Sequence, residues 1–179
     1  MRVIAVLSFM ALCCIRVAAE GGAKIEHLDA SRGESGEHQL VYVTNSGSEE
    51  PIKRTAFVVL HKSGKQELAY GYYVEKGTAK VGLIDSKIIE KVGRVDDSKT
   101  VITIVRVSDE QYEETKAIIK TWTEKEEEID GPSIVFYNSV CQILKACGMK
   151  IPYRSAYRAP NPVQWIGDIP AYSRDLVVR

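Results

Sequence analysis

The residues from Thr100 to Val107 most constrain the fold, because they form a β-branched run with a helix start directly behind it. The run Val101-Ile102-Thr103-Ile104-Val105 is typical of a β-strand. Ser108 and Gln111 then form a capping box, in which the two side chains satisfy backbone groups at a helix start. A strand and a helix in direct succession predict a domain of the α+β class.

Further strands are expected upstream of this run. Residues 39–44 alternate in the manner of a strand, residues 55–60 are apolar and partly β-branched, and residues 67–74 are rich in tyrosine. Ser63-Gly64 is a turn between the last two, which predicts a hairpin. Residues 75–99 are expected to be irregular, with a short apolar piece around Ile88-Ile89.

Two helices are expected after the last strand. The first begins at Ser108 and has one apolar face, made by Tyr112, Thr115, Ile119 and Trp122. The second is predicted from about Asn138 to Cys147, with Asn138 as its N-cap and Gly148 as its C-terminal stop. Its buried face is expected to consist of Val140, Ile143, Leu144 and Cys147.

The first 19 residues have the pattern of a cleavable signal peptide. Arg2 precedes an apolar run from Val3 to Ile15, and Val17-Ala18-Ala19 offers small residues for cleavage. The pattern predicts a secreted or periplasmic protein with no transmembrane anchor after cleavage. Residues 20–37, which are rich in glycine, serine and charge, are expected to form a flexible arm, and residues 38–179 a single domain.

Charge and residue spacing exclude several classes of function. Cleavage after Ala19 removes two arginines and leaves 22 basic and 24 acidic residues, a formal charge of −2, which does not favour nucleic acid. The histidines at 27, 38 and 61 do not combine with Cys141 or Cys147, the cysteines left after cleavage, in a spacing typical of metal ligands. The sequence also has no glycine-rich loop of the kind that binds phosphate. The sequence therefore predicts no metal and no cofactor.

What remains is nucleophilic chemistry at the start of the second helix. Ser139 and Cys141 lie there, where backbone N–H groups and the helix dipole favour an anion, and His61 is the candidate base. On one helix Cys141 and Cys147 would be about 9 Å apart, beyond the ~7 Å reach of a disulfide. The alternatives are a capping role for Ser139, a core position for Cys141 and a solvated hairpin position for His61.

The order of these segments resembles the circularly permuted NlpC-like branch of the papain fold. The likeness covers residues 38–170 and depends on residues 55–60, on Gly71-Tyr72-Tyr73, on residues 107–112 and on the helix that Tyr137-Asn138-Ser139 opens. It implies a papain-like antiparallel sheet packed against helices. It also implies a cysteine hydrolase that acts on amide or ester bonds of a peptide or acyl substrate such as peptidoglycan. Asn138, Thr55, Tyr137 and Tyr72 would then contact the substrate.

This chain departs from the family at its two chemical positions. Thr55 stands where the family has its histidine, and Ser139 stands where it has its cysteine. Either the active pair has moved, with His61 as the base for Cys141 or Ser139, or the chain is an inactive relative that binds or inhibits a protein partner. Binding would use a tyrosine-rich surface, although the same residues could be ordinary sheet positions. The tyrosines in question are Tyr42, Tyr70, Tyr72, Tyr73, Tyr153 and Tyr157.

Overall fold

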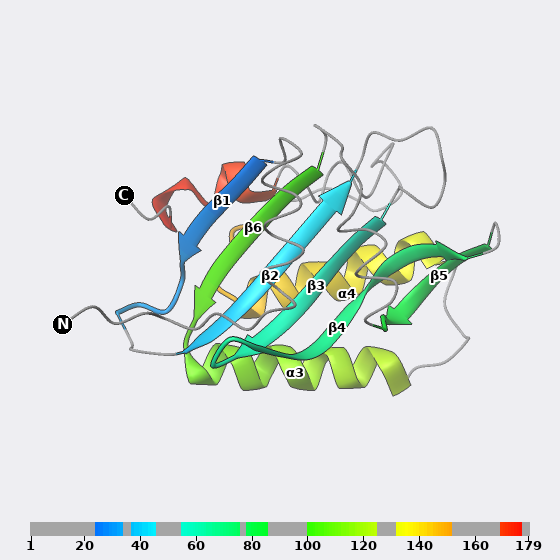
Figure 1. Cartoon of the computed structure of the whole chain (residues 1–179), viewed down its shortest axis with the longest axis horizontal. Coiled ribbons are helices and arrows are strands. Elements are labelled where there is room, and N and C mark those ends of the chain that lie inside the picture. Colours follow the sequence, from blue (N-terminus) through cyan, green and yellow to red (C-terminus); the bar gives the residue numbers. More distant parts are fainter. Residues whose placement is uncertain are drawn as a thin grey trace.

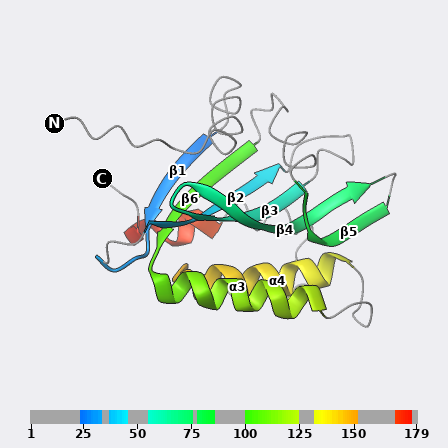
Figure 2. The same ribbon diagram turned by 60° about the horizontal axis from the view of Figure 1, so that its bottom comes forward.

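The structure is a computed structural model that describes residues 24–33, 37–45, 55–75, 78–85, 100–124, 132–151 and 169–176. These residues form a six-stranded sheet with helices against one of its faces (Figure 1, Figure 2). The predicted α+β class is therefore confirmed. The predicted signal peptide, residues 1–19, and the apolar piece around Ile88-Ile89 lie outside the described residues.

The sheet has the strand order β1-β6-β2-β3-β4-β5. Its strands are β1 (Lys24–Asp29), β2 (His38–Asn45), β3 (Thr55–Lys62), β4 (Lys65–Glu75), β5 (Thr78–Leu83) and β6 (Thr100–Val107). The pairing of β1 with β6 is parallel, and all other pairings are antiparallel. The sheet is thus mixed, which corrects the expectation of a purely antiparallel one.

The strands with strong local signals lie where the sequence predicts them. The strand predicted at Thr100–Val107 is β6 with the same bounds, and the predicted hairpin is β3 and β4. Ser63 and Gly64 have φ values of 49° and 74°, as a two-residue hairpin turn of the primed type requires.

Two segments contradict the sequence-based expectations. Residues 24–29, placed in a flexible arm, form β1, because their backbone pairs with β6 over six residues. Residues 78–83, placed in an irregular region, form β5 beside β4.

Helix α3 (Asp109–Glu124) begins as predicted. The Ser108 N–H donates to Gln111 Oε1 (2.8 Å), and the Gln111 N–H donates to Ser108 Oγ (3.2 Å), which completes the capping box. Tyr112, Thr115 and Ile119 are buried, so the predicted apolar face is confirmed. Trp122 packs against the same core.

Helix α4 spans Pro132–Ala146 and therefore begins before the predicted start. Asn138 lies inside it and is not its N-cap, which corrects the expected boundary. Proline suits a first helical position, because its missing N–H would have no partner there. The predicted end is confirmed: Gly148 has φ 76°, and its N–H and that of Met149 donate to Lys145 O (2.8 Å) and Leu144 O (3.0 Å).

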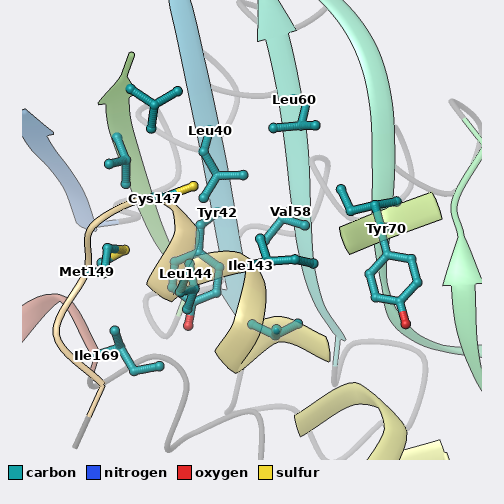
Figure 3. Close-up of a cluster of buried hydrophobic side chains, with 14 of the residues drawn as sticks. Leu40, Tyr42, Val58, Leu60, Tyr70, Ile143, Leu144, Cys147, Met149 and Ile169 are labelled. Carbon is teal, nitrogen blue, oxygen red and sulfur yellow. The ribbon is translucent and has the colours of Figure 1, made fainter. Parts of the chain in front are cut away.

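The main apolar core lies between the sheet and α4 with α3. Figure 3 shows strand side chains such as Leu40, Val58 and Leu60 together with Ile143 and Leu144 of α4, and Ile169 of the short helix η3 (Ile169–Tyr172) joins them. We call this side of the sheet the helix face. Another short helix, η4 (Arg174–Leu176), follows η3. Val140, Ile143, Leu144 and Cys147 are all buried, as predicted.

The opposite side of the sheet, which we call the outer face, carries a second apolar cluster. Its members are Val41, Val43, Phe57, Val59, Ala69, Ile84 and Ile102. Within the described part of the chain, no helix combines the length and apolar character needed to cross a membrane.

Candidate functional site

Ser139 is enclosed in the middle of α4. Its side chain is fully buried, and its hydroxyl donates to the Phe136 carbonyl (3.0 Å) within the same helix. The helix-start geometry that was expected to activate this hydroxyl is therefore absent, because α4 begins at Pro132. A serine that already donates its proton to a helix carbonyl is a poor nucleophile, because no base takes up that proton.

Tyr70 of β4 faces Ser139 from the sheet. Burial raises the pKa of the Tyr70 hydroxyl, and the nearby Ser139 hydroxyl offsets this in part. The Ser139 proton is directed to Phe136, and the Tyr70 hydroxyl has no hydrogen-bond partner among the described residues. Ser139 is thus next to the tyrosine-rich strand β4, and none of the described residues beside it is a base.

The two thiols are both unsuited to attack near neutral pH. Burial raises the pKa of Cys141 to about 11, although contacts with Tyr137 and Lys145 oppose this. Cys147 is completely buried, with its sulfur 3.3 Å from Thr115 Oγ1, and burial raises its pKa to about 12. Both cysteines are free, and both stay protonated at pH 7 because the thiolate is the disfavoured form.

His61 lies on the other side of the sheet from α4. Side chains alternate along a strand, and in β3 Val58 and Leu60 belong to the helix face while Phe57 and Val59 belong to the outer face. The pairing of β3 with β2 is regular from Thr55 to Lys62, so His61 continues the outer row. The predicted pair of His61 with Ser139 or Cys141 is therefore not assembled, which corrects this assignment.

The residues expected to contact substrate are only partly brought together. Tyr72 is half-buried and its ring lies 5.7 Å from that of Phe136 in α4, so β4 and α4 meet here. Tyr137 is buried in the core, and Asn138 is half-buried inside the helix. Thr55 is the first residue of β3 and lies in register with Asn45.

The proposed tyrosine surface is smaller than the sequence suggests. Tyr42 and Tyr70 are each 1% exposed and form part of the main core, which corrects their assignment to a binding surface. Tyr72 and Tyr73 are half-buried, while Tyr153 and Tyr157 lie outside the described residues. Strand periodicity alone does not distinguish core tyrosines from interface tyrosines.

A polar cluster that the sequence did not suggest lies where α3 begins. His38 Nε2 is 3.0 Å from Asp109 Oδ1, and the His38 ring stacks on Tyr112 with centroids 4.2 Å apart. Tyr112 donates to Glu67 Oε2 (2.6 Å), which also accepts from Lys116 (3.0 Å). These hydrogen bonds lower the pKa of Glu67, and burial raises that of Tyr112.

This cluster joins β2, β4 and α3 and has no nucleophile in it. Its partners are distant in sequence, so no spacing could have revealed it. Among the described residues, no group of three or more histidine, cysteine, aspartate or glutamate side chains is placed to hold a metal ion.

Comparisons with known proteins add no assignment: no protein-family model, no curated protein and no solved structure matches the chain. The α+β class follows from the structure itself.

Proposed function

We propose that the chain is an exported, catalytically inactive member of the permuted NlpC-like papain fold that binds a peptide without cleaving it. The observation that carries this proposal is the state of Ser139, which occupies the family's cysteine position. It is buried inside α4 with its hydroxyl bonded to Phe136. Thr55, at the family's histidine position, cannot act as a base near neutral pH.

Two further features support binding over catalysis. Cys141, the alternative nucleophile, has its pKa raised to about 11 by burial, and His61 is on the opposite face of the sheet. The family resemblance depends on the order of the segments in the sequence, in which a hairpin and a β-branched strand precede two helices. The peptide ligand follows from the family, whose substrates include cell-wall peptides.

The direct test measures hydrolysis and binding on the same sample. The mature chain is incubated with soluble peptidoglycan fragments and with a thiol-reactive activity probe, and binding of the fragments is followed by calorimetry. We expect binding without products and without labelling of Cys141, because labelling requires an exposed thiolate. Product formation that disappears in Ser139→Ala or Cys141→Ala would favour the hydrolase instead, and absence of binding would refute a cell-wall peptide as the ligand.

A further inference from the structure

The outer face ends in a polar row that crosses five strands in register. Asp29 pairs with Arg106, Arg106 with Gln39, Gln39 with His61, and His61 with Gln66. The apolar cluster of the outer face, which includes Val41 and Val59, ends beside this row. His61 is the β3 member of this row and is 4% exposed.

Nothing described in the structure balances a charge on His61. Its neighbours in the row on β2 and β4 are the neutral side chains of Gln39 and Gln66, and no hydrogen bond or ion pair of the imidazole is found among the described residues. The positive Arg106 lies one strand beyond Gln39, and Lys62 and Lys65 flank the turn. A protonated His61 would therefore lie between neutral side chains of the row, and the nearest charged member of the row, Arg106, is also a cation.

The described acidic side chains at this end of the sheet are engaged elsewhere. Asp29 accepts from Ser31 (2.6 Å) and lies 3.9 Å from Arg106, while Glu37 accepts from Ser63 (2.6 Å). The Glu67 carboxylate is held by Tyr112 and Lys116 of α3 on the helix face. Asp109 faces His38 on that same side, and Asp85 after β5 is exposed.

The β3–β4 ladder is also irregular at His61. The register shifts between Leu60 and His61, so the regular pairing of the hairpin is interrupted next to this buried imidazole. Besides the ladder with β2, the hairpin end is held by the bonds of Ser63 to Glu37 and of Glu67 to Tyr112 and Lys116. Local opening here would cost less than opening in the regular part of the sheet.

We propose that His61 makes this end of the sheet acid-sensitive: protonation places an unbalanced charge under the outer face and loosens the β3–β4 hairpin. Burial lowers the pKa of His61 below its ordinary value. The open or unfolded chain then binds the proton more readily than the closed one. Stability is accordingly complete above about pH 6.5 and falls as the pH decreases toward the lowered pKa.

The test is amide hydrogen exchange of the full mature chain at about pH 7.5 and about pH 5, corrected for the intrinsic pH dependence of exchange. We expect protection in residues 55–75 to fall on acidification, by up to about tenfold per pH unit, and less in β1 and β6. His61→Gln should remove this loss of protection. His27→Gln, at an exposed position of β1, is the matched control and should keep it.

Equal loss of protection in wild type and His61→Gln, or no loss in wild type, would overturn the proposal. An NMR titration of the wild-type imidazoles covers the case in which His61→Gln does not fold. The signal of His61 should titrate below the value of about 6.5 of an unperturbed histidine. A midpoint at or above that value would overturn the proposal as well, whether or not the chain binds a peptide.

Discussion

Gln111 connects three elements through one side chain. Its Oε1 accepts from Ser108 at the start of α3, and its Nε2 donates to the Ala30 carbonyl just after β1 (3.1 Å). A Cβ at Gly148, which ends α4, would lie 3.1 Å from the same Nε2. The capping box was evident from sequence, but the second bond was not, because a glutamine in a capping box needs only its oxygen.

This double role predicts that Gln111→Glu is destabilising although glutamate is equally good in a capping box. The acceptor for Ser108 is kept, but an oxygen replaces the donor to Ala30, so the carbonyl loses its partner and faces a negative charge. We expect a loss of about 1–3 kcal/mol in the free energy of unfolding, measured by urea denaturation. Glu110→Gln, a neighbouring exposed change, is the control, and an unchanged stability of Gln111→Glu would show that the Ala30 bond contributes nothing.

Local sequence signals predicted the boundaries of some helices and strands correctly and of others wrongly. The β-branched run of β6 and the capping box of α3 needed no tertiary information. For α4, two start signals compete, Asn138 as a cap and Pro132 as a first helical residue. The helix begins at the earlier one, and Phe136 packs in the core as a result.

The sequence did not predict strands β1 and β5, for a different reason. Their sequences, KIEHLD and TAKVGL, are short and carry charged or small residues, so neither shows a strong strand pattern. Each is an edge strand that depends on its neighbour for pairing. The prediction that His61 lies beside α4 was wrong for a similar reason. The alternation of side chains separates the two faces of β3, but it does not reveal which of these faces the helices cover.

The contact between β3 and β4 depends on Gly71. A Cβ at this residue would lie 2.4 Å from the Ala56 carbonyl oxygen and from the Phe57 Cβ, closer than real atoms approach. Gly71→Ala therefore has to push the two strands apart. We expect a loss of at least about 1–3 kcal/mol by urea denaturation, the usual cost of overpacking. Thr78→Ala, at an exposed position of the neighbouring strand, should have little effect, and a stable Gly71→Ala would contradict the close approach of β3 and β4.

Both faces of the sheet carry an apolar cluster, and the helices of the described residues cover one of these faces. β1 takes part in both clusters, since Leu28 belongs to the main core and Ile25 packs against the outer one. The Ala30 N–H also donates to Arg106 O (2.9 Å), which extends the parallel pairing with β6. This strand is therefore packed into the sheet and its two clusters, although the sequence placed it in an arm before the domain, and we expect it to unfold together with the rest.

Leu28→Ala tests whether β1 is integral to the fold. Leu28 is 2% exposed, and truncating a buried leucine costs about 2–5 kcal/mol through lost burial and the cavity left behind. If β1 unfolds together with the rest, this loss lowers the midpoint of the whole transition, and tryptophan fluorescence and far-UV circular dichroism report the same midpoint. His27→Ala, its exposed neighbour, should stay within about 0.5 kcal/mol of wild type. If β1 were instead a peripheral arm, Leu28→Ala would leave the main transition unchanged, because an element that opens separately contributes nothing to the stability of the remainder.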